Sequence, residues 1–249
     1  MGHIHIYSGK EELTNAVAQR WAELSKQAIA KHGAFHAALS GGSTPRMLYE
    51  RLAMPDLVNR IDWSKTYLYF GDERSVPLDN ADSNYCMAKE SLLDHINIST
   101  SQVFPMQAAA EDIHACANDY ASILKGHLPA SEQGGVRFDL ILLGIGDDGH
   151  TASLFPDTEI LNQHEKLVDA VYVKKLNTWR MSLTLPVINN AQNIIVLVSG
   201  GGKADILHQV LDEPPRSRPF PIQLIEPHGT MEWYVDAAAA QKLSQGERI

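Results

Sequence analysis

The chain of 249 residues is 44% hydrophobic and 20% charged, which suits a globular protein with a sizeable core, built as one large α/β domain or two small ones. Its net charge of −9 argues against non-specific binding to nucleic acid or to an anionic membrane. The two cysteines, Cys86 and Cys116, lack the close spacing of metal-binding pairs. This argues against a disulfide framework and a cysteine–zinc site, and it indicates a reducing compartment.

The sequence carries no sign of secretion or of a membrane span. Residues 1–7 lack the basic region and the apolar core of a signal peptide. No apolar run is long enough to cross a bilayer. We therefore expect a cytoplasmic protein that does not associate with membranes.

The first half of the chain predicts strands and helices in alternation. Ile4 and Ile6 alternate with polar residues, as in a strand near a sheet edge. Thr44 before Pro45 predicts a helix N-cap followed by proline at the first helical position, and Ser83 can cap a further helix. The expected elements are a helix over residues 10–31, a strand over 35–39, a helix over 47–52, a strand over 66–70, a polar loop over 71–77, and helices over 84–93 and 113–128.

The second half continues the same alternation. The expected elements are buried strands over residues 138–143 and 193–198, alternating strands over 167–173 and 180–186, a helix ending near 211, late strands over 221–225 and 231–235, and a short final helix capped by Asp236. Strands that alternate with helices predict a doubly wound, largely parallel sheet flanked by helices. Since no repeat, low-complexity tract or linker divides the chain, we expect residues 1–249 to form a single α/β domain.

A glycine-rich segment follows the predicted buried strand 138–143. Gly144, Gly146 and Gly149 permit close approach of the backbone. Open α/β sheets bind their ligands where such strands end. The amides of these glycines could therefore stabilise the oxyanion that forms when a nucleophile attacks a carbonyl group.

His150 closes this segment and is the side chain in it that exchanges protons near neutral pH. One interpretation is a general base that activates water, and the other is a tight turn with a surface histidine. Asp148, two residues earlier, could fix the tautomer of the imidazole or could cap the turn.

A second glycine-rich loop follows the predicted strand 35–39. Its backbone amides, its hydroxyls and the start of the next helix together suit an anion, although a tight turn with a helix cap explains it equally well. It has neither the Walker A spacing nor the GxGxxG pattern, so nucleotide binding is not supported. The residues of this loop are Ser40, Gly41, Gly42, Ser43 and Thr44.

Three basic residues lie at predicted ends of strands or starts of helices. Arg74 follows a strand and has acidic neighbours, so it could belong to a solvated ion cluster. Arg180 begins a strand and could be a plain edge residue. Lys203 would enter a helix N-terminus, where a cation is unfavourable unless an anion is bound in front of it. At the ligand-facing edge of an acidic protein, the three would form a focused anion pocket that suits phosphate.

Several catalytic classes have no support in the sequence. The histidines form no HExxH or similar metal-binding set, and no GxSxG turn supplies a nucleophilic serine. A hydrolase built on this chain would therefore use water directly.

The motifs resemble those of 6-phosphogluconolactonases over nearly the whole chain. The longest and most specific block is Gly144-Ile145-Gly146-Asp147-Asp148-Gly149-His150-Thr151-Ala152-Ser153-Leu154-Phe155-Pro156. The other matching blocks, in order, are Ser40-Gly41-Gly42-Ser43-Thr44-Pro45, Gly71-Asp72-Glu73-Arg74-Ser75-Val76-Pro77, Asp82-Ser83-Asn84-Tyr85 and Gly201-Gly202-Lys203-Ala204.

The resemblance implies the fold of the sugar-phosphate deaminases and ribose-5-phosphate isomerases. It implies hydrolysis of 6-phospho-D-glucono-1,5-lactone to 6-phospho-D-gluconate in the oxidative pentose phosphate pathway, without a required cofactor or metal, by a protein that is monomeric. His150 would be the general base. The phosphate would be held by Arg74, Arg180 and Lys203, with help from the loop of residues 40–44.

Two rival functions remain open at this stage. Deaminases of similar sequence carry a glutamate five residues after the histidine, where this chain has Phe155, and tend to have tyrosine where it has Arg74. Both differences favour the lactonase. Asp72 is common to both classes, and it could orient Arg74 or the sugar. A non-catalytic sugar-phosphate sensor is the second rival, but the chain has no basic stripe for DNA.

Overall fold

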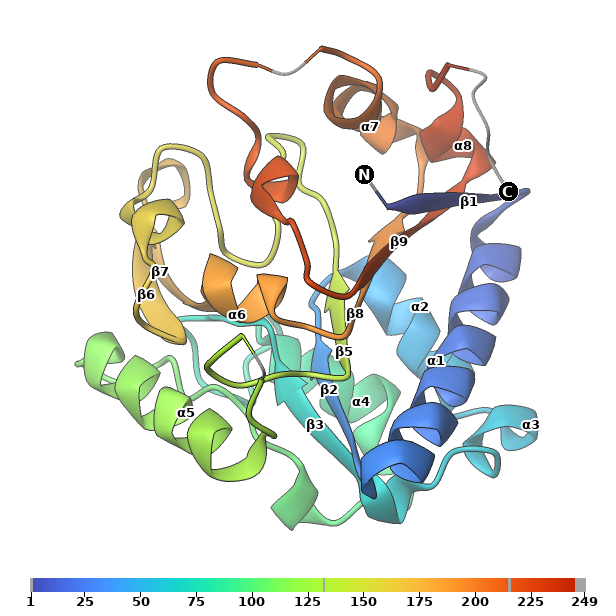
Figure 1. Ribbon diagram of the computed structural model, residues 1–249, viewed down its shortest axis with the longest axis vertical. Coiled ribbons are helices and arrows are strands. Elements are labelled where there is room, and N and C mark those ends of the chain that lie inside the picture. The colour runs from blue at the N-terminus through green and yellow to red at the C-terminus, as the bar shows by residue number, and fades with distance from the viewer. Residues whose placement is uncertain (1, 132, 215, 245–249) are drawn as a thin grey trace.

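The computed structural model describes residues 2–131, 133–214 and 216–244. Six parallel strands form a central sheet in the order β1-β9-β8-β5-β2-β3 (Figure 1). The predicted parallel sheet is thus confirmed, with β1 at its edge as expected. The strands of this sheet are β1 His3–Tyr7, β2 Phe35–Leu39, β3 Thr66–Phe70, β5 Leu140–Leu143, β8 Asn193–Val198 and β9 Thr230–Asp236.

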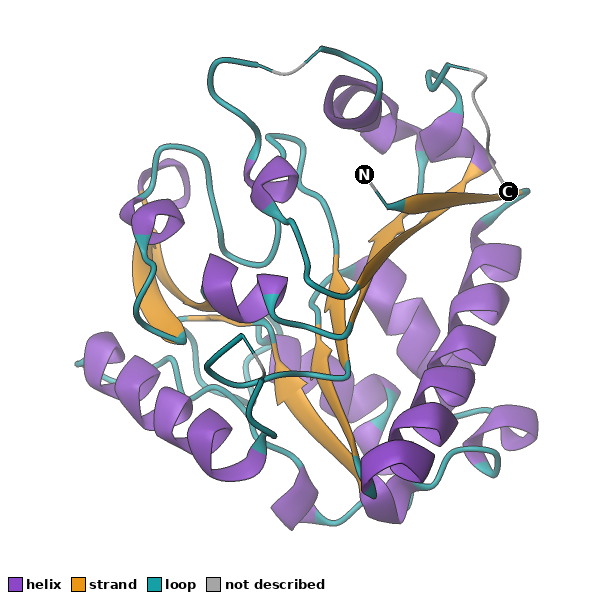
Figure 2. Ribbon diagram, in the orientation of Figure 1, coloured by secondary structure: helices purple, strands orange, loops and turns teal. Residues whose placement is uncertain are grey.

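Helices cover both faces of the sheet (Figure 2). The longest, α1, packs against β1, β2, β9 and α2 through a buried face that includes Leu13, Val17 and Trp21. It ends at Gly33, whose φ of 91° is left-handed and whose amide donates to Ile29 O, as expected for a glycine C-cap. The helices are α1 Lys10–His32, α2 Ser43–Leu52, α3 Pro55–Val58, α4 Asn84–Ser91, α5 Ile113–His127, α6 Leu185–Asn189, α7 Ala204–Leu211 and α8 Ala237–Ala240.

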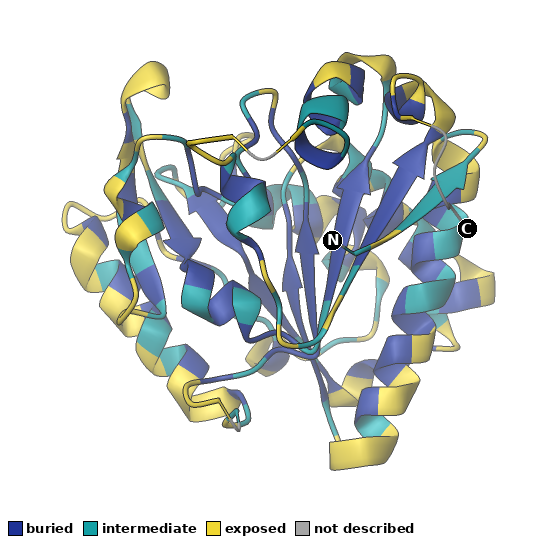
Figure 3. Cartoon of the chain, turned by 45° about the horizontal axis from the view of Figure 1, so that its top comes forward, coloured by how far each residue is buried: buried dark blue, intermediate teal, exposed yellow. Residues whose placement is uncertain are grey.

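The core lies between the sheet and these helices. Strands β2 and β5 are buried along their whole length, and exposed residues gather on the outer helix faces and loops (Figure 3). This burial explains why both strands are continuous apolar runs, as in parallel sheets that are covered on both faces. Among the described residues, no helix is long and apolar enough to cross a membrane.

A second sheet, absent from the sequence prediction, lies beside the first. It is antiparallel, with the order β4-β7-β6, and it pairs Arg74 with Arg180. Its strands are β4 Asp72–Arg74, β6 Val168–Val173 and β7 Thr178–Leu183. The prediction of a loop over residues 71–77 is therefore wrong for residues 72–74. These three polar residues form a strand because they pair with β7.

Three further local predictions are wrong. The N-cap of α2 is Gly42, not Thr44, so Thr44 lies inside the first turn of the helix.

The strand predicted over 180–186 ends at Leu183, and Pro186 lies in the first turn of α6, where its missing N–H costs nothing. The strand predicted over 221–225 is the 3₁₀ helix Pro221–Leu224, and Gln223 accepts a hydrogen bond from the Phe220 amide at its start.

Candidate active site

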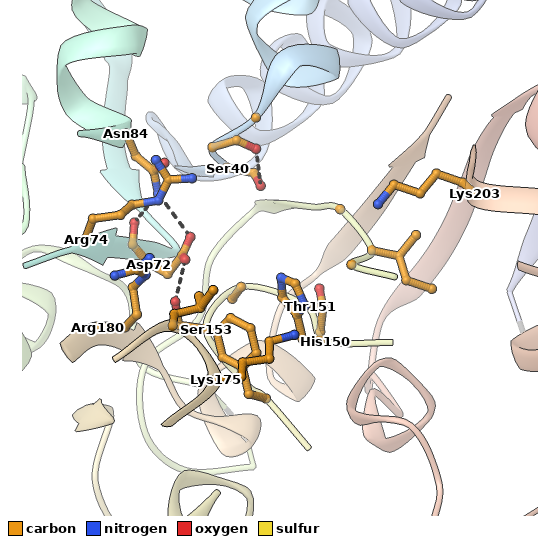
Figure 4. A pocket seen from close by; sticks show the side chains of 18 residues that line it. Ser40, Asp72, Arg74, Asn84, His150, Thr151, Ser153, Lys175, Arg180 and Lys203 are labelled. Atoms are coloured by element: carbon orange, nitrogen blue, oxygen red, sulfur yellow. Dashed lines mark hydrogen bonds between the residues drawn. The ribbon is translucent and has the colours of Figure 1, made fainter. Parts of the chain in front are cut away.

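A cavity of about 340 Å³ opens where the central strands end (Figure 4). The sheet order reverses between β2 and β5, and the loops after these two strands line the cavity, as expected of a ligand site in an open α/β sheet. Ten of the residues proposed from the sequence line it: Ser40, Gly41, Gly42, Asp72, Arg74, Gly144, Gly146, His150, Arg180 and Lys203. The other lining residues are Asn84, Ile145, Thr151, Ala152, Ser153, Phe155, Lys175 and Leu176.

His150 is held from two sides. Its Nδ1 lies 2.5 Å from Oδ1 of Asp148, and that same oxygen accepts the backbone N–H of His150 at 3.2 Å. The ring of Phe155 stacks on the imidazole with centroids 4.1 Å apart. Asp148 therefore both orients the imidazole and caps the turn, and Nε2 is the ring nitrogen left for a substrate or for water.

The glycines of this loop make room for the imidazole. A Cβ at Gly146 would lie 1.9 Å from Nδ1 of His150, so the ring packs directly on the glycine backbone. The Gly146 amide donates to His150 O at 2.8 Å, and the Gly149 amide donates to Gly146 O at 3.0 Å. These two amides are committed within the loop, unlike the free oxyanion donors that the sequence suggested, whereas Gly144 lines the cavity.

The loop after β2 has the opposite character. Among the described residues, the amides of Gly41 and Gly42 donate no hydrogen bond, and they lie at the N-terminus of α2. Ser43 and Thr44 do not line the cavity, and the Thr44 hydroxyl lies 3.0 Å from that of Ser199. Free amides at the positive end of a helix are a ready site for an anion.

Arg74 and Arg180 lie side by side because their strands pair in register. Burial and the charge of Arg74 both lower the pKa of Arg180 from its usual value. Both arginines donate hydrogen bonds to oxygens other than carboxylates: Arg74 donates to Asp82 O, and Arg180 donates to Trp179 O at 3.0 Å. Within the part of the chain that the structure describes, neither arginine forms a salt bridge. Two adjacent arginines at the cavity wall thus have no carboxylate in direct contact, although the charges of Asp72, Glu73 and Asp82 partly offset the lowering of the Arg180 pKa.

Lys203 lies apart from the two arginines. Figure 4 shows it on the other side of the cavity, with Ser40 between them in that view. Its Nζ lies 2.5 Å from Oδ1 of Asp147, a carboxylate that is 84% exposed. The three basic residues expected to form one pocket therefore line one cavity but do not form one cluster.

The acidic residues Asp72 and Glu73 have separate roles. Asp72 accepts hydrogen bonds from the Ser153 hydroxyl at 2.7 Å and from the Asn84 side-chain amide at 3.2 Å, and it forms neither a hydrogen bond nor a salt bridge with Arg74. Glu73 is fully buried and accepts from the hydroxyl of Ser83 and the backbone amides of residues 74, 84 and 85, although burial raises its pKa. Glu73 thus anchors the start of α4, while Asp72 faces the cavity.

Sequence reasoning missed several residues of the cavity wall. Lys175 comes from the turn between β6 and β7, which carries no motif, so only the fold could place it here. Asn84 and Thr151 lie within the quoted sequence blocks, and each has a buried polar atom (Asn84 Oδ1 and Thr151 Oγ1) without a hydrogen-bond partner among the described residues. In the same part of the chain, no group of three or more His, Cys, Asp or Glu could hold a metal ion.

Comparison with known proteins identifies the family. The family described as glucosamine-6-phosphate isomerases/6-phosphogluconolactonase matches residues 8–233. The chain belongs to this family. A 6-phosphogluconolactonase of Synechocystis sp. is 38% identical over 224 residues, which cover 87% of this chain and 88% of that protein. The solved structure of 6-phosphogluconolactonase from Trypanosoma brucei is 30% identical, with a TM-score of 0.87 over 98% of this chain and 99% of that one.

The family fold extends to deaminases. A monomeric glucosamine-6-phosphate deaminase superposes with a TM-score of 0.81 over 96% of this chain and 99% of that one, at 20% identity. This likeness confirms the expected fold class. At the discriminating position, Phe155 stacks on His150, so no carboxylate reaches the imidazole from that side.

Proposed function

We propose that this chain is a cytoplasmic 6-phosphogluconolactonase, which hydrolyses 6-phospho-D-glucono-1,5-lactone to 6-phospho-D-gluconate. The observation that carries the proposal is that one cavity is lined both by His150, whose imidazole is oriented by Asp148, and by two arginines without a carboxylate partner. The first is the machinery of a general base, and the second suits a phosphorylated substrate. The family and the names of its members support the same activity.

In the proposed reaction, Nε2 of His150 takes a proton from water as the water oxygen attacks the lactone carbonyl. Asp148 holds the opposite nitrogen at 2.5 Å and stabilises the imidazolium that forms. The tetrahedral intermediate collapses with cleavage of the bond to the ring oxygen, which receives the proton from the imidazolium. In this scheme, the Gly144 amide in the loop after β5 donates a hydrogen bond to the oxyanion of the intermediate.

The phosphate is proposed to lie at the free amides of Gly41 and Gly42. An anion there has Arg74 and Arg180 on one side and Lys203 on the other (Figure 4). Guanidinium groups bind phosphate oxygens in pairs, whereas the lysine supplies a point charge. Asp72 and Asn84, with acceptor oxygens at the same wall, would receive hydroxyl groups of the sugar.

A direct test compares the native protein with His150→Ala in an assay coupled to the oxidation of 6-phosphogluconate, after subtraction of spontaneous hydrolysis. General base catalysis contributes about 10²- to 10⁴-fold, so kcat should fall by that factor while the fold is retained. His164→Ala, at an exposed histidine outside the cavity, is the matched control and should leave kcat unchanged. Near-native turnover by His150→Ala, or ammonia release from glucosamine 6-phosphate, would refute the proposal.

A further inference from the structure

Lys175 contacts both of the groups that hold His150. It lies in the turn Lys174–Leu176, which joins β6 to β7. Its Nζ donates to Oδ2 of Asp148, while Oδ1 of the same carboxylate takes Nδ1 of His150 at 2.5 Å. Nζ also lies 5.0 Å from the centre of the Phe155 ring, which stacks on the imidazole. Asp148, Phe155 and Lys175 thus form a connected set of three side chains beside the imidazole.

We propose that Lys175 is a positioning residue for His150, which holds Asp148 in place and keeps the imidazole in its uncharged, proton-accepting form. This inference rests on the proposed role of His150 as general base. It gives the β6–β7 turn, which carries no catalytic motif, a defined part in the reaction.

The electrostatic argument starts from Asp148. Burial of this carboxyl would raise its pKa, but the hydrogen bonds from Lys175 and His150 outweigh burial and lower the pKa to about 2. The carboxylate is therefore charged at every working pH. A carboxylate alone beside an imidazole favours the imidazolium, which cannot accept a proton. The ammonium of Lys175 on the other carboxylate oxygen offsets this effect.

Other charged groups around His150 contact neither its ring nor the Asp148 carboxylate. Asp72 and Arg74 come from β4, Arg180 comes from β7, and Lys203 precedes α7 and pairs with Asp147. The neighbouring groove, which is lined by Asp148 and shares Phe155 and Lys175 with the cavity, adds His114, which pairs with Asp169 at 3.8 Å. Among the lysines and arginines of the described chain, Lys175 is therefore the one that forms a salt bridge with Asp148.

The inference is tested with Lys175→Met through the pH dependence of kcat/KM for lactone hydrolysis. Loss of a partly exposed charge at this range should move the acid limb upward by about 0.5 to 1 pH unit. Activity at pH 6 should then fall about 3- to 10-fold, while the plateau above pH 8 should stay within about 3-fold of native. Lys175→Arg, which keeps the charge, should restore the native profile.

Lys174→Met is the matched control. Lys174 is the preceding residue of the same turn, and it forms no salt bridge within the described part of the chain and does not line the cavity. This variant should leave the acid limb where it is. An acid limb that also moves in Lys174→Met would assign the effect to the turn as a whole and would overturn the inference.

A second readout does not depend on turnover. The titration midpoint of the His150 imidazole, followed by NMR in the absence of substrate and assigned by comparison with His150→Gln, should move up in Lys175→Met. A higher KM with an unmoved acid limb would make Lys175 a substrate ligand, and no change in either readout would make it incidental; both results overturn the inference. Failure of the proposed function looks different, because His150→Ala would then keep the native rate.

Discussion

Two glycine-rich loops open at the same edge of the central sheet and use glycine for opposite purposes. In the loop after β2, the amides of Gly41 and Gly42 lack partners among the described residues and lie at the start of α2. In the loop after β5, the amides of Gly146 and Gly149 are bonded within the loop, and the missing side chain of Gly146 makes room for an imidazole. The first loop leaves its donors free, as an anion site requires, and the second packs against the imidazole that we propose as the general base.

A run of glycines in the sequence does not reveal whether the amides of a loop are free or bonded within it. Both loops follow buried strands, and both suggest backbone donors for a bound anion. The difference lies in what each loop contacts: Asn84 approaches the Gly41 backbone from α4, while the imidazole of His150 folds back on Gly146 within its own loop. Substitutions that add one methyl group to each loop can therefore separate the two roles.

The largest effect is expected from Gly146→Ala. The added Cβ would lie 1.9 Å from Nδ1 and Cε1 of His150, so the ring must leave its place between Asp148 and Phe155. We expect kcat to fall about 10²- to 10⁴-fold, as for loss of the base itself. Steady-state kinetics of lactone hydrolysis, with the thermal unfolding midpoint as a check on the fold, measure this.

Gly144→Ala is the control for that substitution. Alanine keeps the backbone amide that is proposed to bind the oxyanion, and the nearest atom to the added Cβ is Leu197 O at 4.0 Å, an ordinary contact, so kcat should change by less than about 3-fold. If both variants lose activity equally, the loop tolerates no side chain for a general reason, and the special role of Gly146 as a support for the imidazole is refuted.

An intermediate effect is expected at the arginine pair. Arg180→Met removes one of two guanidinium groups that line the cavity without a carboxylate partner. A hydrogen bond to a charged group contributes about 1.5–3 kcal/mol, which predicts a rise in KM of about 10- to 100-fold with kcat nearly unchanged. Arg46→Met, at an exposed arginine on α2 that pairs with Glu50, should leave KM unaltered.

The contrast between Arg180 and Lys203 sharpens this prediction. Lys203 already has a carboxylate partner in Asp147, so its loss should raise KM less than the loss of Arg180 does. A larger effect of Lys203→Met than of Arg180→Met would move the anion site from the arginine pair to the start of α7.

The sequence predicts much of this arrangement, but not all of it. The apolar runs that became β5 and β8, and the capping residues Ser83 and Asp236, are local signals that the structure confirms. Strand β4 could not be recognised, because a strand of Asp-Glu-Arg exists through its pairing with β7. The place of Lys175 at the site could not be predicted for the same reason, since its neighbours in space lie far away in the sequence.

The smallest effect, and the sharpest test of the loop after β2, is expected from Gly41→Ala. Its added Cβ would lie 1.9 Å from Oδ1 of Asn84, a buried side chain that donates to Asp72 O at 2.8 Å. Because the buried Asn84 side chain cannot easily move, the loop after β2 should shift and displace its free amides. We therefore expect KM to rise about 10-fold while kcat is preserved.

A double-mutant cycle decides whether that contact is the cause. In an Asn84→Ala background the obstacle is gone, so Gly41→Ala should cost much less, and the two substitutions should be strongly non-additive in KM. Gly202→Ala, whose Cβ meets nothing within 4 Å, controls for a methyl group at another glycine-rich turn near the cavity. Additive effects would show that Asn84 does not position the loop, and a fall in kcat would show that this loop acts on the reacting carbonyl, which would erase the distinction between the two loops.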